Sequence, residues 1–526
     1  MIRILLLAFG IIGLSSIRAN THETICCTTF NKIDIKNLIK GEKYLVTDNC
    51  DLNGRELLIP EGCIIQFAGG SFTNGTLRLS NNVTIDGNGT TCYPRSTRDK
   101  DNNISNTAFI YAEGVKNISI RNIVLKGSYE ESMGNLPFKS RKVVDSEHLI
   151  YIGNCDGVTI SGLTITNFYS NKSDCEWYEV YSSHKGFYPI LIHNTKDINI
   201  IDCKHTKSAG EAWNIFFSKN ITINKTVFES RYGVSFLTIM YSNNVNVMNS
   251  KFVRKSALEK DTGNLVNIFA SNVLFENNVV EGGDYDWGNE HVNCQAAQDY
   301  SHISYRTKNV RILNNNFIGC KLTNNTALPI HGFLPKYITN EIMIKGNIFS
   351  RTLIGICFGV RGNVKKAVIE SNTIESENYE VLTTSSRFQT IVAYNTCPEI
   401  LYIKNNIINC SKSVYDYSFS GPVGAILIND GKKIIISNNS IKAPFGIRYM
   451  GNAKMTVISN TVMCKKPQII DVSRGFLDYS NNTISYEENS ENNYITISER
   501  RSRFSNNIYR TDIKDVIIGN VGMKLF

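Results

Sequence analysis

The chain has 526 residues, of which 42% are hydrophobic and 20% are charged. This composition excludes an intrinsically disordered protein, because such chains lack the apolar residues needed to bury a core. The formal net charge is +9, and Lys and Arg are spread along the chain without runs. That pattern argues against a dedicated nucleic-acid-binding protein but is compatible with an acidic polymer as ligand.

Residues 1–19 have the pattern of a secretory signal peptide. Arg3 precedes an apolar run from Ile4 to Leu14, and small and polar residues then lead to Ala19. The run is too short to cross a bilayer as a helix of the mature protein. No other segment is long and apolar enough for a membrane span. We therefore expect an exported protein, either secreted or periplasmic.

Residues 20–95 are predicted to form an N-terminal cap and the first units of a repetitive fold. Short runs of strand-forming residues alternate here with NG, GG and DG turns, which are typical of closely spaced strands. An open end of a repetitive structure must be covered, and this Gly-rich region is the candidate cover.

A short phrase, apolar-x-apolar with Asn or Asp one or two positions later, recurs through the rest of the chain. The copies INIIDCKH, ITINKTVF and VNVMNSKF begin at Ile198, Ile221 and Val245, which are 23 and 24 residues apart. Each copy has the two-residue alternation of a half-buried strand. Further copies begin at Ile118, Val158, Val273, Val310, Ile342, Val368, Ile400, Ile434, Met455, Leu477 and Phe504.

A fixed repeat of short strands predicts a solenoid, because one unit cannot bury its own apolar side chains and must stack on the next. We predict a parallel β-helix over residues 96–510, with a C-terminal cap strand at 511–526 and very little helix. Asn-Asn doublets recur at one phase of the unit. There Asn is expected to adopt a left-handed conformation and to hydrogen-bond its counterpart in the next coil.

The run IPEGCIIQFAGGSFTNGTLRL at 59–79, followed by the stacked coils, resembles the secreted bacterial right-handed parallel β-helix proteins of the pectate-lyase-like superfamily. The resemblance covers about residues 40–510 and implies an all-β, right-handed parallel β-helix. That superfamily includes lyases, glycoside hydrolases, epimerases and non-catalytic adhesive proteins. The paired NTD and GHG motifs of pectin hydrolases are not found in this sequence.

All 14 cysteines follow the signal segment, which in an exported chain suggests disulfide bonds. Cys320, Cys410 and Cys464, however, share one phase of the repeat and belong to coils that are not neighbours. At about 4.8 Å per coil they would be separated by roughly 10 Å or more, which is beyond the reach of a disulfide bond. We predict that these three are free, buried thiols.

Three repeat units are longer than the others, so residues 128–147, 168–187 and 281–299 are predicted to leave the coil as loops. If they emerge on one side, these loops form the walls of a groove, here called the trough, and the short coils of 198–273 form its floor. Loops on a rigid scaffold commonly carry binding groups.

Aromatic and polar residues in and between these loops are the candidate polysaccharide-binding groups. Aromatic rings can pack on the C–H surface of sugar rings while the sugar hydroxyls stay hydrogen-bonded. The alternative is that the aromatic residues only fasten the loops to the helix. The candidate substrate-binding residues are Trp177, Trp213, Tyr232, Asp261, Trp287, Glu290 and His291.

The predicted floor offers two sets of catalytic residues. Glu211 and Glu229, on comparable corners of successive coils, would suit hydrolysis by a pair of carboxylates. Lys204, Arg231 and His205 would suit β-elimination, in which cations neutralise a uronate and a base removes a proton. The alternative is a ladder of surface ion pairs without a catalytic role.

No cofactor is expected. The motif Asp284-x-Asp286 with Glu290 offers oxygen ligands for calcium, but it lacks the spacing of an EF-hand. The cysteines and histidines match no zinc pattern, and no nucleotide-binding fingerprint is present. Two function classes remain open. One is an exported polysaccharide lyase or glycoside hydrolase, and the other is a non-catalytic carbohydrate-binding or surface structural protein.

Overall fold

The computed structural model describes most of the repetitive region of the chain. The described residues are 23–25, 38–97, 108–130, 143–145, 148–168, 188–233, 235–255, 265–282, 285–286, 308–320, 322–323, 339–352, 355–358, 364–375, 389–393, 397–410, 424–466, 469–472, 475–486, 494–497, 503–509 and 515–518. Within these ranges every regular element is a β-strand, and no helix that could span a membrane occurs. The predicted signal peptide lies outside the described residues.

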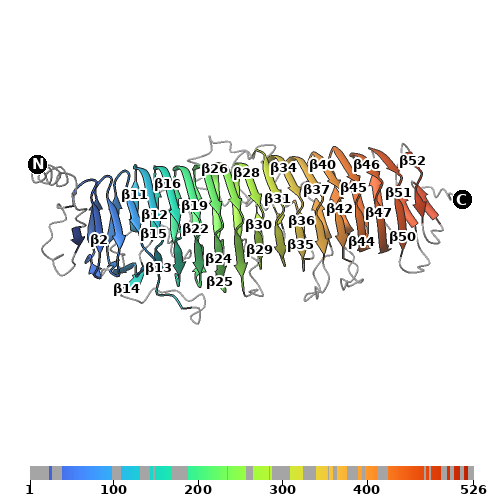
Figure 1. Ribbon diagram of the computed structural model, residues 1–526. Helices are drawn as coiled ribbons and strands as arrows, with labels where there is room; N and C mark the ends of the chain where they lie inside the picture. Colours follow the sequence, from blue (N-terminus) through green and yellow to red (C-terminus); the bar gives the residue numbers. More distant parts are fainter. Residues whose placement is uncertain are drawn as a thin grey trace, which may run out of the picture.

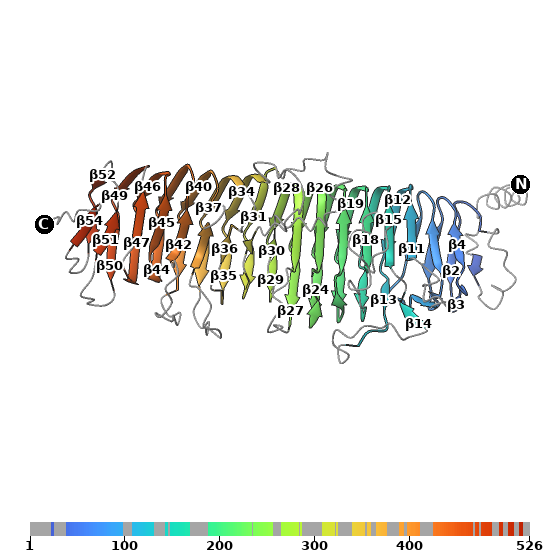
Figure 2. The same ribbon diagram turned by 180° about the vertical axis from the view of Figure 1, so that it is seen from behind.

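The strands wind into a right-handed parallel β-helix, which confirms the fold predicted from the repeats. Each full coil passes through three parallel sheets, called here sheets 1, 2 and 3 in the order in which the chain visits them. Figure 1 shows one elongated stack of coils with the two termini at opposite ends, and Figure 2 shows the same stack from behind. Sheets 1 and 2 are continuous where β26 (Leu237–Met248) and β28 (Val266–Glu276) run through the corner between them.

Sheet 1 is built from β4 (Glu56–Ile59), β7 (Thr76–Leu79), β11 (Ala108–Glu113), β15 (His148–Gly153), β18 (Ile190–His193), β22 (Trp213–Phe216), the first halves of β26 and β28, β30 (Tyr285–Asp286), β33 (Leu322–Thr323), β36 (Ile356–Cys357), β39 (Gln389–Ala393), β42 (Gly424–Asn429), β45 (Ile447–Gly451), β48 (Ile469–Val472), β51 (Tyr494–Ile497) and β54 (Asp515–Ile518).

Sheet 2 is built from β1 (Glu23–Ile25), β2 (Lys43–Val46), β5 (Ile64–Phe67), β8 (Thr84–Asp86), β12 (Lys116–Arg121), β16 (Asp156–Ser161), β19 (Lys196–Ile201), β23 (Lys219–Asn224), the second halves of β26 and β28, β31 (Val310–Leu313), β34 (Thr339–Lys345), β37 (Val364–Glu370), β40 (Ile400–Lys404), β43 (Lys433–Ser437), β46 (Lys454–Ile458), β49 (Phe476–Ser480) and β52 (Arg503–Ser505).

Sheet 3 is built from β9 (Thr91–Cys92), β13 (Val124–Lys126), β17 (Thr164–Thr166), β20 (Lys204–Thr206), β24 (Val227–Ser230), β27 (Lys251–Arg254), β29 (Val279–Glu281), β32 (Asn316–Ile318), β35 (Ile348–Ser350), β38 (Thr373–Glu375), β41 (Ile407–Asn409), β44 (Ser440–Phe445), β47 (Thr461–Lys466), β50 (Thr483–Tyr486) and β53 (Ile508–Tyr509). Three small pairs complete the fold: β3 (Cys50–Asp51) with β6 (Phe72–Thr73), β10 (Arg95–Thr97) with β14 (Val143–Asp145), and β21 (Ala209–Gly210) with β25 (Tyr232–Gly233).

The repeated phrase of the sequence forms the strands of sheet 2. Ile118, Val158, Ile198, Ile221 and Val245 are direct register partners in consecutive coils, and their side chains are buried in the coil interior. Such a column is stable because each apolar side chain stacks on an equivalent one about 4.8 Å away.

Three of the predicted starting points are out of register. Ile342 pairs with Ala367 instead of Val368, and Ala367 pairs with Leu401 instead of Ile400. In the last coil Phe504 pairs with Tyr479, two positions beyond Leu477. At Val368 and Ile400, runs of consecutive apolar residues leave it ambiguous in the sequence which residues face inward, whereas stacking in the coil fixes this. The shift at Phe504 is two positions, so the inward face is unchanged there.

The Asn-Asn doublets divide the two predicted roles between their two residues. The first residue has the left-handed backbone, as at Asn405 with a φ of 57°. The second is buried and forms the ladder: the backbone N–H and Nδ2 of Asn372 both donate to Oδ1 of Asn406, at 2.9 and 3.0 Å. Nδ2 of Asn406 donates in turn to Oδ1 of Asn439 and to the backbone carbonyl of Ile369. Each ladder amide is therefore fully hydrogen-bonded inside the coil. The same ladder runs through Asn278, Asn315, Asn347, Asn372, Asn406, Asn439, Asn460, Asn482 and Asn507.

The prediction for the three cysteines is confirmed, since Cys320, Cys410 and Cys464 are buried thiols that form no disulfide bond. Cys50, which the sequence left open, is disulfide-bonded. Burial raises the pKa of the Cys92 thiol to about 12, so this thiol stays protonated at physiological pH.

Candidate functional site

Sheet 1 is buried on both of its faces between β15 and β28. Outward-pointing residues of a solenoid sheet normally face water. In these coils Asn199 of sheet 2 is half-buried and Lys204 of sheet 3 is exposed. In sheet 1 the equivalent outward positions are buried, including Phe216, Met240 and Phe269, which form a second apolar cluster outside the coil interior. This stretch of the outer surface departs from the pattern of a regular solenoid sheet.

Polar side chains are buried in the same stretch of sheet 1. Asn214, Thr238 and Asn267 are direct register partners in β22, β26 and β28, and their side chains are 1%, 6% and 1% exposed. Glu211, just before β22, is 5% exposed. We call Glu211, Asn214, Thr238 and Asn267 the polar patch.

One amide of the polar patch has no hydrogen-bond partner among the described residues. Nδ2 of Asn267 donates to Oγ of Ser235 at 3.2 Å. In the part of the chain that the structure describes, Nδ2 of Asn214 is buried and finds no hydrogen-bond acceptor. An unpaired buried amide lowers stability by about 1–3 kcal/mol. A packing role alone would be served better by an apolar residue, so this position favours a ligand-binding role.

The longest intervals between strands adjoin sheet 1. Residues between β13 and β15, and between β17 and β18, join sheet 3 to sheet 1, whereas 287–309 join sheet 1 to sheet 2. The first two insertions therefore begin at one edge of sheet 1 and the third begins at the opposite edge. The sheet between these attachment points is sheet 1, whereas Lys204 and Glu229 belong to sheet 3. The trough over the short coils of 198–273 stays a prediction.

Two of the predicted site residues lie inside the coil. His205 is 1% exposed and Trp213 is fully buried, and their rings meet edge to face with centroids 6.4 Å apart. Burial lowers the pKa of His205 to about 3, so its imidazole is neutral at physiological pH. His205 stacks in register with Ile165 and Phe228, which are core positions. The structure therefore does not bring His205 or Trp213 to the surface where the sequence predicted a base and a sugar-binding ring.

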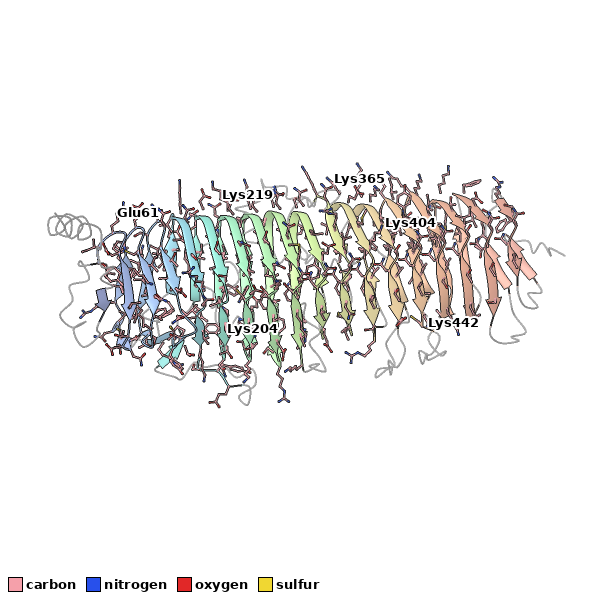
Figure 3. All side chains as sticks on the ribbon, in the orientation of Figure 1. Glu61, Lys204, Lys219, Lys365, Lys404 and Lys442 are labelled. Atoms are coloured by element: carbon pink, nitrogen blue, oxygen red, sulfur yellow. The ribbon has the colours of Figure 1, made fainter. Side chains whose placement is uncertain are left out.

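Lys204 and Glu229, two charged residues of the predicted floor, lie on the outer face of sheet 3. Figure 3 shows Lys204 of β20 on the same side of the molecule as Lys442 of β44, away from Lys219 and Lys365 of sheet 2. Glu229 forms an ion pair with Lys255. The hydrogen bond from Lys255 and its positive charge hold the pKa of the Glu229 carboxyl below its ordinary value. Arg231 is exposed.

Glu211 and Glu229 are not stacked on each other. Glu229 pairs in register with Thr206, five positions before Glu211, and Gly210 pairs with Gly233. Glu211 is buried at the entrance to sheet 1, whereas Glu229 belongs to sheet 3. The register therefore separates the two carboxylates that the sequence placed together.

Several other predicted residues lie outside the described part of the chain. They are Trp177, Asp261, Asp284, Trp287, Glu290 and His291, and for Tyr232 and Asp286 only the strand position is described. Trp177 and Trp287 as rim residues, and the calcium alternative, remain predictions. Among the described residues no group of three or more His, Cys, Asp or Glu side chains could hold a metal ion.

The sequence did contain a signal for the buried face of sheet 1. The strand segments HLIYIG, WNIF, LTIM and VNIF are apolar on consecutive residues, which is typical of parallel strands buried on both faces. Asn214, Thr238 and Asn267 interrupt these runs at one outward position. They were missed because each occurs singly and no motif marks it.

Comparison with known proteins identifies no close relative. No family model matches the chain, and no curated protein matches it. Similar solved structures include a family 28 exopolygalacturonase of Yersinia enterocolitica, with 10% identity, coverage of 95% of this chain and 79% of that one, and a TM-score of 0.28. They also include the surface adhesin PfbA of Streptococcus pneumoniae, with 13% identity, 90% and 83% coverage and a TM-score of 0.26. A tailspike protein double mutant of Escherichia coli bacteriophage HK620, in complex with a pentasaccharide, has 12% identity, 84% and 74% coverage and a TM-score of 0.33. Similarity at this level carries no argument about the activity of this chain.

Proposed function

We propose that this chain binds a polysaccharide along the outer face of sheet 1 and cleaves its glycosidic bonds there, with Glu211 as the candidate catalytic carboxylate. The observation that carries the proposal is the polar patch, a buried carboxylate with two amides and a hydroxyl on a face that a plain solenoid would leave to water. Buried polar groups lower stability unless they are paired, so such groups gather where binding requires them.

The patch has the chemistry for this role. A carboxyl group can protonate the leaving oxygen of a glycosidic bond or activate a water molecule for attack. The amides of Asn214 and Asn267 and the hydroxyl of Thr238 both donate and accept hydrogen bonds, as sugar hydroxyls do. Their column runs along the helix axis, so successive residues of an extended saccharide would meet successive coils.

The alternative is a non-catalytic carbohydrate-binding protein that uses the same face. It is favoured by the separation of Glu211 from Glu229 and by the position of His205 inside the coil. Without these partners, Glu211 would serve as a hydrogen-bond acceptor for sugar hydroxyls. A lyase would still have Lys204 and Arg231 for a uronate, but it would need a base other than His205.

The proposal is tested with the purified protein and a panel of polygalacturonate, alginate, xylan and dextran. Affinity electrophoresis measures retention by each polymer, while reducing ends and the absorbance of unsaturated uronates measure cleavage. We expect retention together with new reducing ends and no unsaturated product. Retention without cleavage would support the binding protein, unsaturated products would support a lyase, and the absence of both retention and cleavage would contradict the proposed function.

A further inference from the structure

Two aromatic residues adopt a backbone conformation that bulky side chains normally avoid. Phe217 has a φ of 52° and Tyr241 a φ of 54°. Among the described non-glycine residues with positive φ they are the only aromatic ones, and most of the others are Asn. A left-handed backbone is strained for a bulky residue, and such strain is retained mainly at functional positions.

The same corner of neighbouring coils carries Asn. The backbone N–H groups of Asn154, Asn194 and Phe217 donate to the carbonyls of His193, Phe216 and Met240. These hydrogen bonds place Asn154, Asn194, Phe217 and Tyr241 at one corner between sheets 1 and 2. Nδ2 of Asn194 donates to Oδ1 of Asn154 at 2.5 Å. Asn at the next two positions would suit the backbone and extend this ladder, yet the chain has aromatic rings there.

The two rings form a continuous half-buried surface. Phe217 and Tyr241 are stacked, with centroids 5.1 Å apart and an angle of 12° between the ring planes. Phe269 meets Tyr241 edge to face at 5.8 Å. Both stacked rings pack against the apolar cluster of Phe216, Met240 and Phe269. In β22, β26 and β28 those three residues lie two positions after Asn214, Thr238 and Asn267, so the apolar cluster adjoins the polar patch on one side and the two rings on the other.

We infer that Phe217 and Tyr241 form a docking platform for a sugar ring of the polysaccharide, beside the polar patch. The inference rests on the proposed function and adds a specific subsite to it. The half-buried rings offer apolar edges to the C–H surface of a pyranose, and a neighbouring sugar of the same polysaccharide would meet the amides of the polar patch across the apolar cluster. Packing contributes to this arrangement, since Phe217 also meets His193 edge to face at 5.6 Å, but Asn would fit the backbone of this corner and extend its ladder.

The test is the double variant Phe217→Asn/Tyr241→Asn, compared with the parent by affinity electrophoresis on polygalacturonate, alginate, xylan and dextran. We expect at least about tenfold weaker binding to the polymer that retains the parent, because two ring contacts are lost. The melting temperature should stay within about 5 °C of the parent, because the substitutions relieve backbone strain while they remove ring packing. Phe476→Asn is the control, since Phe476 is an exposed aromatic residue on distant β49, and it should retain full binding.

The possible results distinguish failure of the ring platform from failure of the proposed function. A double variant that folds and is retained like the parent overturns the platform and leaves the proposed function standing. A parent that none of the four polymers retains overturns both. If the double variant does not fold, Tyr241→Asn alone carries the test. It should weaken binding at least about threefold, and unchanged binding overturns the platform.

Discussion

Replacing Glu211 with Gln should reduce glycosidic cleavage by about 10²–10⁴-fold and leave polymer retention nearly unchanged, because general acid–base catalysis contributes a factor of this size. Gln preserves the shape of the side chain and its hydrogen-bonding oxygen, but it cannot exchange a proton at neutral pH. The measurement is the rate of appearance of reducing ends with the polymer that the parent cleaves, at saturating concentration, with retention measured in parallel.

Glu229→Gln is the matched control for this prediction. Glu229 is paired with Lys255 on sheet 3, so its variant should cleave within about twofold of the parent. Loss of activity in Glu229→Gln but not in Glu211→Gln would move the catalytic site to sheet 3. Arg231→Ala separates the two chemistries, because a lyase acting on an acidic sugar would lose a charge partner, whereas a hydrolase at Glu211 would keep its rate.

Asn406→Ala should lower the free energy of unfolding by about 3–4 kcal/mol. The substitution removes the Oδ1 acceptor from the backbone N–H and Nδ2 of Asn372, and it removes the Nδ2 donor from Oδ1 of Asn439 and from the carbonyl of Ile369. The backbone N–H of residue 406 still donates to Oδ1 of Asn439. Each buried polar group left unpaired contributes about 1–3 kcal/mol. Asn406 is 1% exposed, so water does not readily replace the lost hydrogen bonds. Urea unfolding followed by circular dichroism measures the change.

The preceding residue offers a control within the same doublet. Asn405 is exposed and has a φ of 57°, a conformation that Gly adopts without strain. Asn405→Gly should therefore change the unfolding free energy by less than about 1 kcal/mol. Equal changes in unfolding free energy for the two variants would contradict the assignment of the backbone role to Asn405 and the ladder role to Asn406.

Most of the fold could be predicted from the sequence because a solenoid repeats its local pattern. The column from Ile118 to Val245 was readable from two-residue alternation, and the lack of disulfide bonds at Cys320, Cys410 and Cys464 followed from their common phase. The predicted inward-facing positions were wrong at Val368 and Ile400, because consecutive apolar residues there allow two registers. In both places the coil buries the neighbouring residue, Ala367 or Leu401.

The site was less predictable because it depends on which side of the coil each residue faces. His205 lies between Lys204 and Thr206, so in a strand it must face opposite to both, yet all charged and polar residues of this segment were placed on one floor. The partners in register, Ile165 and Phe228, show that His205 faces inward. Glu211 was identified as a candidate, but the other residues of the polar patch, Asn214, Thr238 and Asn267, come from three different coils and share no sequence motif.

The most direct test of the central claim compares the three faces of the β-helix in one affinity-electrophoresis experiment. Asn214→Ala, Asn199→Ala and Thr206→Ala each remove one outward polar group, from sheets 1, 2 and 3 respectively. With the polymer that retains the parent, Asn214→Ala should bind about three- to tenfold more weakly, the loss expected for one hydrogen bond. The other two variants should bind like the parent. Weaker binding by Asn199→Ala or Thr206→Ala, with full binding by Asn214→Ala, would contradict the assignment of the site to sheet 1.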